Sequence, residues 1–201
     1  MSVRLPSSLA WATEVAVFAK GTFFVGRRAY ISERFGESAW DEFLRDLGRE
    51  DPVFAKPILA TTLVPIESYF LFHDRSVERF FRGDAKALWT IGEKSAEWSL
   101  THGPYKHLKN NPQSLAEFVA KLPLIWSAFF TEGRLESKMV DETTIEIELL
   151  DLPVSHSSFE DAVMGYGKRA IELVSSRTVT EHRLLGMQRG RNRVHYRFVL
   201  R

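Results

Sequence analysis

Apolar residues recur every three or four positions along most of the first 130 residues. In "GESAWDEFLRDLG", Trp40, Phe43, Leu44 and Leu47 follow one another at helical spacing, so one face of this segment is apolar. Segments with this spacing predict helices over about 21–35, 36–48, 66–81 and 84–101. A further amphipathic segment begins near Leu115.

Terminal signals set the expected ends of these helices. Ser38 is the predicted N-cap of the second helix, with Asp41 in the capping-box position. Gly48 is its predicted C-terminal stop. Pro123 lies within the segment that starts near Leu115, so we expect it to kink or split that helix.

Beyond residue 130 the hydrophobic period changes from helical to alternating. Ile145, Ile147 and Leu149 alternate with Glu146 and Glu148, which predicts a hairpin with one wet face. The last strand alternates in the same way, with Val194, Tyr196, Phe198 and Leu200 inward and Arg193, His195, Arg197 and Arg201 outward. A helix over about 157–175 separates the two hairpins.

This order predicts one α+β domain covering residues 1–201. A helical half covers about 20–130, and a four-stranded antiparallel sheet with a crossing helix (ββαββ) covers about 131–201. The C-terminal hairpin turns near "QRGRN", and the proline-containing stretches are loops rather than linkers.

Composition narrows the classes of function. The chain has 44% hydrophobic and 26% charged residues and a net charge of +1, so no global field draws it to nucleic acid. It contains no cysteine, which excludes disulfides, thiolate metal sites and cysteine nucleophiles. No apolar run is long enough to span a membrane or to form a signal peptide. We expect a cytoplasmic protein.

Motifs for catalysis are also missing. The six histidines form no metal-ligand spacing, and no carboxylate pair or catalytic triad is evident. Gly165 and Gly167 in "MGYGKR" do not follow a strand, so they predict close helix packing rather than a phosphate loop. "SHSSFE" predicts a turn and N-cap before a helix. The chain is therefore expected not to be an enzyme and to bind no metal.

A basic patch lies at the C-terminus, in "RGRNRVHYR". It comprises Arg189, Arg191, Arg193 and Arg197, a candidate surface for an anion or a partner. The near-neutral total charge favours a solvated sheet face, on which Glu146 and Glu148 of neighbouring strands balance the arginines. We expect no nucleic-acid binding.

The order of elements resembles one known superfamily. It contains haem–nitric-oxide-binding (H-NOX) domains, 4-vinyl-reductase (V4R) sensor domains and TRAPP vesicle-tethering subunits. "KGTFFVGRRAYISERFGESAWDEFLRDLG" resembles the H-NOX opening, and "LWTIGEKSAEWSL" resembles the segment with Trp and Gly ahead of a small-residue stripe. The resemblance covers roughly residues 20–200 and implies the H-NOX-like fold.

The haem-binding features of H-NOX domains are missing at their matching places. The helix before the sheet, "SLAEFVAKLPLIWSAFF", has Ile125 or Trp126 where the resemblance implies a proximal histidine. The haem-propionate pattern Y-x-S-x-R occurs instead at Tyr30, Ser32 and Arg34, in a predicted helix. Residues two apart on a helix differ in direction by about 200°, so the three cannot grip one pair of carboxylates. We expect no haem and no other cofactor.

Aromatic residues concentrate in the helical half, where the resemblance implies a ligand pocket. The candidate ligand-binding residues are Phe70, Trp89, Trp98, Trp126, Phe129 and Phe130. Two functions remain open: a sensory domain that binds an apolar or aromatic small molecule or an acyl chain, or an interaction module with a filled pocket. Either function implies a partner signalling protein and a homo-oligomer.

Overall fold

The computed structural model describes residues 16–103, 105–111, 115–152, 154–187 and 192–201. Six α-helices occur there: α1 Thr22–Phe35, α2 Glu37–Glu50, α3 Ile66–Phe81, α4 Ala87–Thr101, α5 Leu115–Ser127 and α6 Ser157–Ser175. The strands are β1 Phe18–Lys20, β2 Leu63–Pro65, β3 Arg134–Met139, β4 Thr144–Leu150, β5 Val179–Leu185 and β6 Val194–Leu200. Short 3-10 helices span Pro52–Ala55 and Lys106–Leu108. The α+β class predicted from the sequence is confirmed.

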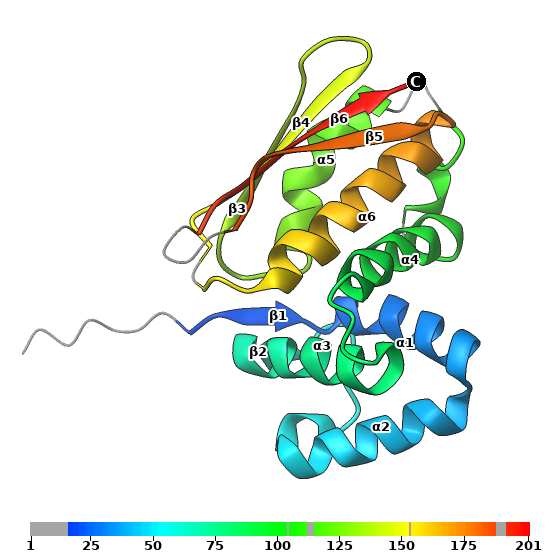
Figure 1. The fold of residues 1–201 in the computed structure, drawn as a ribbon, viewed down its shortest axis with the longest axis vertical. Helices are drawn as coiled ribbons and strands as arrows, with labels where there is room; N and C mark the ends of the chain where they lie inside the picture. Colours follow the sequence, from blue (N-terminus) through cyan, green and yellow to red (C-terminus); the bar gives the residue numbers. More distant parts are fainter. Residues whose placement is uncertain (1–15, 104, 112–114, 153, 188–191) are drawn as a thin grey trace, which may run out of the picture.

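The four longer strands form one antiparallel sheet in the order β3-β4-β6-β5. Figure 1 shows α5 and α6 packed against this sheet, with α4 between α6 and the group formed by α1, α2 and α3. Helix α6 connects β4 to β5 along the chain. One cluster of buried apolar side chains runs from Phe23 in α1 to Leu200 in β6, so the helical group and the sheet share a core.

Both predicted ends of helix α2 differ from those in the structure. The helix begins at Glu37 with Gly36 as its N-cap, and Ser38 lies inside the first turn without a capping role. Gly36 has a φ of 94°, a conformation that glycine adopts without steric cost. The helix also continues past Gly48 to Glu50, and the backbone at Ala55 packs closely against this glycine. The capping pattern predicts a helix start in the right region, but places the cap too late in the chain.

Pro123 does not split α5, which runs unbroken from Leu115 to Ser127. Proline has no N–H to donate to the carbonyl of Val119, four residues earlier. That carbonyl accepts a hydrogen bond from Ser137 Oγ on β3 instead, at 2.6 Å. The sheet therefore supplies the donor that the helix lacks, and α5 stays continuous against β3.

A second, two-stranded sheet was not expected from the sequence. β1 pairs antiparallel with β2, and both strands are only three residues long. β1 also binds the segment after α5: Lys20 N–H donates to the carbonyl of Phe129 at 2.7 Å, and Ala19 bridges to Phe130. The backbone at Phe129 and Phe130 is therefore fixed by a strand near the start of the described chain.

Helices α4 and α6 approach closely because each presents a glycine to the other. A Cβ atom at Gly92 would lie 2.1 Å from the carbonyl oxygen of Ala162, and one at Gly165 would lie 2.4 Å from the carbonyl oxygen of Trp89. The packing role predicted for Gly165 is confirmed.

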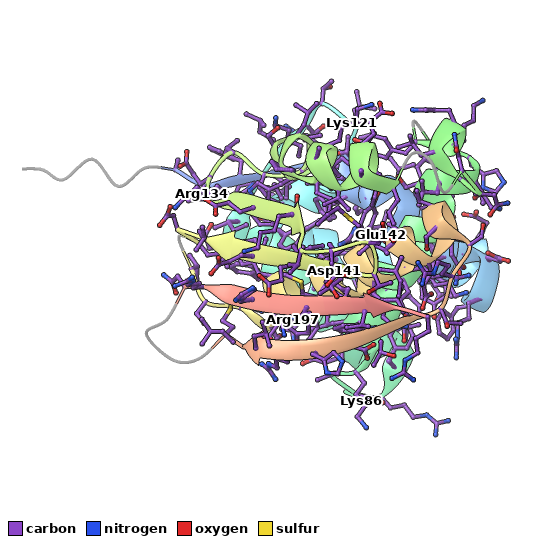
Figure 2. All side chains as sticks on the ribbon, turned by 90° about the horizontal axis from the view of Figure 1, so that it is seen from above. Lys86, Lys121, Arg134, Asp141, Glu142 and Arg197 are labelled. Carbon is purple, nitrogen blue, oxygen red and sulfur yellow. The ribbon has the colours of Figure 1, made fainter. Side chains whose placement is uncertain are left out.

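The outer face of the sheet is polar and carries matched charges. Arg197 donates to Glu146 from Nη2 at 2.7 Å, and Arg193 pairs with Glu148 on the same neighbouring strand. Figure 2 shows Arg197 and Arg134 on this sheet. Hydrogen bonds from Arg197 hold the pKa of Glu146 down to about 2 despite the opposing effect of burial. In the described ranges no helix is long and apolar enough to cross a membrane.

Candidate functional site

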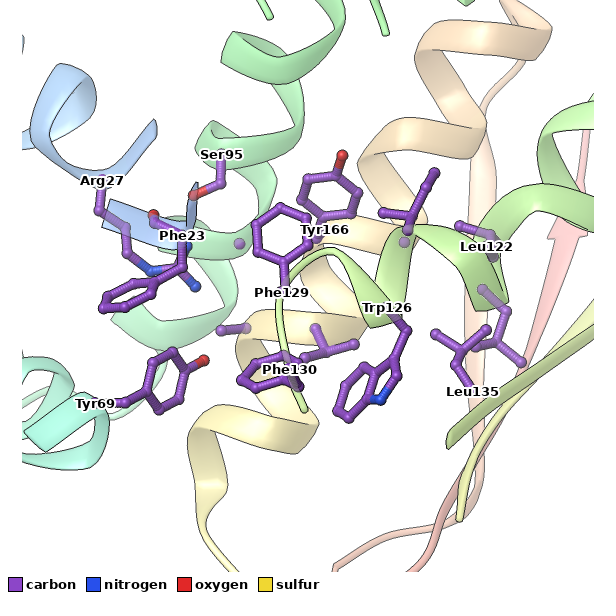
Figure 3. A pocket seen from close by; sticks show the side chains of 16 residues that line it. Phe23, Arg27, Tyr69, Ser95, Leu122, Trp126, Phe129, Phe130, Leu135 and Tyr166 are labelled. Atoms are coloured by element: carbon purple, nitrogen blue, oxygen red, sulfur yellow. The ribbon is translucent and has the colours of Figure 1, made fainter. Parts of the chain in front are cut away.

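The helical group and the sheet meet around an apolar cavity of about 60 Å³ (Figure 3). Its walls come from α1, α3, α4, α5, α6, β3 and β4. Apolar side chains form most of the lining: Phe23, Leu122, Ile125, Trp126, Phe129, Phe130, Leu135, Ile147, Ala162 and Val163. The polar residues Arg27, Tyr69, Ser95 and Tyr166 complete the wall.

Three of the predicted ligand-binding residues line this cavity together. Trp126, Phe129 and Phe130 come from the end of α5 and the turn after it. The other three are elsewhere. Trp98 lines a second cavity, Trp89 donates from its indole nitrogen to Glu93, and Phe70 stacks on His156 with ring centroids 4.1 Å apart.

Trp126 is buried and, with Ile125, is one of the two residues at the position that the family resemblance aligns with a haem ligand. Its indole N–H donates to the carbonyls of Gly133 at 3.1 Å and Glu132 at 3.3 Å. Its ring centroid lies 4.4 Å from that of Phe130. The indole thus ties the end of α5 to the start of β3, while its apolar part forms one wall of the cavity.

A second cavity of about 280 Å³ adjoins the first. The two share Phe23, Arg27, Ser95, Phe129 and Tyr166 in their walls. The side chain of Phe129 is half-buried, while its backbone is held by β1. Phe129 is thus one of the five side chains that lie between the two spaces.

Sequence reasoning missed a buried polar pair at one end of the cavity. Arg27 of α1 is only 7% exposed, and its Nε donates to Nε2 of His73 at 2.8 Å. Nδ1 of His73 lies 2.7 Å from the carbonyl of Tyr69, which assigns the ring proton to Nδ1. The two residues are 46 positions apart on different helices, so no local pattern could have joined them.

Burial, and then the charge of Arg27, hold the pKa of His73 well below its ordinary value. The ring is therefore neutral and accepts the Arg27 hydrogen bond. The unfolded chain binds a proton on this histidine more readily than the folded chain does. The contribution to stability is complete above about pH 6.5 and is lost as the pH falls below it.

We expect the free energy of unfolding to fall between pH 6.5 and pH 5 by up to about 1.4 kcal/mol per pH unit from His73. His73→Gln keeps an acceptor for Arg27 but cannot titrate, so its slope should be flatter. Urea unfolding at several pH values in this range measures the free energy of unfolding of the wild type and of the variant. Parallel pH profiles for the wild type and the variant would contradict the assignment. The groups that face His73 are Arg27, Tyr69 and, farther away, His156.

The remaining predicted motifs are placed as follows. Tyr30, Ser32 and Arg34 lie on α1, as expected for a helix, and Arg34 donates to the Tyr30 hydroxyl at 3.1 Å. Of the basic patch, Arg193 and Arg197 are paired with glutamates, and Arg189 and Arg191 lie outside the described residues. The N-cap predicted in "SHSSFE" is His156, whose side chain accepts a hydrogen bond from the Ser158 N–H.

No group of three or more potential metal ligands occurs within the described ranges. The polar groups at the cavity are hydroxyls and one guanidinium rather than acid–base pairs. Tyr166 donates from its hydroxyl to Ser99 at 3.0 Å, and Ser95 donates to the carbonyl of Ile91. This arrangement can bind and orient a molecule.

No family model and no curated protein matches this chain. Solved structures do match. A single-substitution variant of the Tt H-NOX domain has a TM-score of 0.69 at 15% identity, over 90% of this chain and 95% of its own. An oxygen-binding H-NOX domain related to soluble guanylate cyclases, in its oxygen complex, gives 0.68 at 14% identity, with coverages of 90% and 95%.

A third structure, titled for modulating haem redox potential through protein-induced porphyrin distortion, gives a TM-score of 0.63 at 16% identity, with coverages of 90% and 99%. Because these identities are low, the likeness concerns the fold. The chain has an H-NOX-like fold along nearly its whole length, as the sequence resemblance predicted.

Proposed function

We propose that this protein is a non-enzymatic, haem-free sensor domain. It binds an apolar or aromatic small molecule, or an acyl chain, in the cavity between the helices and the sheet, and it signals through a partner protein. The observation that carries this proposal is the apolar cavity at the meeting point of seven elements, with a larger adjoining space that shares five of its lining residues. A ligand there would touch both halves of the fold, which is what a sensor requires.

Two features of the cavity support the proposal that the protein binds no haem. Haem iron needs a histidine, cysteine, methionine or tyrosine ligand. The cavity wall contains no histidine and no methionine, and burial raises the pKa values of both its tyrosines, Tyr69 and Tyr166, away from the phenolate form. A volume of about 60 Å³ accommodates only a few water-sized groups, so the residues present do not fit a porphyrin.

The same small volume favours a second candidate function. If the side chains fill the pocket permanently, the protein is an interaction module and a homo-oligomer, as the sequence resemblance to tethering subunits also allows. The V4R and tethering branches of that resemblance stay predictions. A ligand larger than a few atoms requires lining side chains to move, and binding data therefore decide between the two functions.

Thermal unfolding with 1-octanol and phenol tests the proposal. The protein is first refolded from denaturant to remove copurifying molecules. At least one of the two compounds should raise the melting temperature, because binding to the folded state alone stabilises it by about 2.7 kcal/mol at 100 times Kd.

Val163→Phe places a ring in the cavity wall and should abolish the shift, whereas Val140→Phe, an exposed site on a distant turn, should preserve it. No shift with either compound, together with a native mass spectrum showing a bare homo-oligomer, would favour the interaction module instead.

A further inference from the structure

Arg27 has no charged partner within the described part of the chain. Its hydrogen bonds go to the His73 ring at 2.8 Å and, from Nη1, to the carbonyl of Phe23 at 2.9 Å. Its guanidinium carbon also lies 5.3 Å from the centroid of the Phe23 ring. These contacts are neutral, and no carboxylate of the described residues forms an ion pair with this side chain.

The positive charge of Arg27 is nevertheless retained. Burial lowers the pKa of Arg27 from its ordinary value, but a guanidinium is not deprotonated in proteins. His73 is neutral and carries no compensating charge. A buried cation without a counter-ion is costly, and arginine is the side chain best suited to hold a carboxylate through its planar fork. The described fold therefore contains a cation without a counter-ion of its own.

Tyr69 supplies a second, independent observation at the same end of the cavity. The residue is fully buried and lines the cavity, and its hydroxyl makes no hydrogen bond of regular geometry within the described residues. The polar side chains near it are Arg27 and Ser158, which lower its pKa. Figure 3 shows this hydroxyl pointing from α3 into the pocket, next to the Arg27 side chain. Burial raises the pKa of Tyr69 more than the nearby Arg27 charge lowers it, so the hydroxyl keeps its proton and is a donor. A buried donor left unpaired costs about 1–3 kcal/mol.

The opposite end of the cavity is apolar, with Trp126, Leu122 and Leu135 as its wall (Figure 3). We propose that the cavity selects ligands with a single carboxylate, whose two oxygens accept from the Arg27 guanidinium and the Tyr69 hydroxyl while the apolar remainder lies toward Trp126. Two donors match a carboxylate, whereas a phosphate presents more oxygens than this site has donors. This inference rests on the proposed function and specifies the chemical class of its ligand.

A matched pair of probes tests the selection. Octanoate and 1-octanol have the same apolar chain and differ at the end group. Isothermal titration calorimetry at pH 7.5 should give wild-type protein roughly tenfold or more tighter binding of octanoate than of 1-octanol, since a charge-assisted hydrogen bond contributes about 1.5–3 kcal/mol. Arg27→Gln should remove that preference while 1-octanol binding persists, which also shows that the variant is folded. Arg28→Gln, an exposed neighbour on the same helix, should keep the preference.

Tyr69→Phe removes only the hydroxyl and should weaken octanoate binding several-fold without weakening 1-octanol binding. If Arg27→Gln fails to fold, the Tyr69→Phe variant alone tests carboxylate selection. Equal affinities of the wild type for the two probes, or an unchanged preference in Tyr69→Phe and Arg27→Gln, would overturn carboxylate selection and leave the sensor function intact. Failure of both probes to bind, together with no melting-temperature shift from phenol, would overturn the sensor function as well.

Discussion

Trp126→Ala is expected to lower the free energy of unfolding by roughly 3–5 kcal/mol, the range for truncating a buried tryptophan. The side chain is 5% exposed and packs on Phe130 and Phe159. The change also leaves the carbonyls of Gly133 and Glu132 without their indole donor. Urea unfolding followed by circular dichroism measures the loss, because the variant lacks one of the fluorophores.

The same variant distinguishes a cavity wall from a closed core. Removing the indole enlarges an existing apolar cavity, and enlarged apolar cavities bind small aromatic molecules. Indole should therefore raise the melting temperature of Trp126→Ala more than that of the wild type. Trp98→Ala, at a half-buried tryptophan of the second cavity, is the matched control and should cost less. A loss below about 1 kcal/mol for Trp126→Ala would contradict its buried position.

Gly92→Ala should destabilise the protein by about 3 kcal/mol, the upper part of the range for overpacking. The added methyl group would lie 2.1 Å from the backbone oxygen of Ala162. A backbone atom cannot rotate away, so α4 and α6 must separate along their length. This cost exceeds the gain of up to about 1 kcal/mol that alanine gives over glycine inside a helix.

Gly26→Ala is the matched control for this prediction. Gly26 also lies inside a helix and faces α4, but a Cβ there would be 3.4 Å from Ser95, an ordinary contact. We expect it to be neutral or stabilising, by no more than about 1 kcal/mol. Equal effects of the two substitutions in chemical denaturation would show that α4 and α6 are not packed through Gly92.

Periodicity predicted most of the secondary structure, since it follows from how each segment buries one face. The spacing of Phe43 and Leu47 predicted α2, and the alternation of Tyr196 and Phe198 predicted a strand with these residues inward. The same reasoning placed Tyr30 on a helix and so argued against a haem-propionate clamp. Short signals at helix ends were less reliable, because Gly48 serves a contact with Ala55 rather than a helix stop.

The candidate site was only partly accessible to sequence reasoning. Trp126, Phe129 and Phe130 were identified through their place at the end of the predicted helix before the sheet and through the family likeness. Trp89 and Phe70 were chosen with them because aromatic side chains look alike in a sequence, whether they face a cavity or another ring. Which of them reaches the cavity depends on the rotation of each helix against its neighbours, set by contacts such as Gly92 on Ala162.

The sequence by itself determined the class of fold, the wet face of the sheet and the absence of cysteine chemistry. These features can be determined from the sequence because the hydrophobic period depends only on neighbouring residues, and composition is a sum over the whole chain. Only the tertiary structure decided that Arg27 meets His73, that the Tyr69 hydroxyl makes no hydrogen bond of regular geometry within the described residues, and that both lie at one end of an apolar cavity. Burial and pairing arise from contacts between segments far apart in the chain. Because of these contacts Arg27, which belongs to no sequence motif, is the best candidate for ligand recognition.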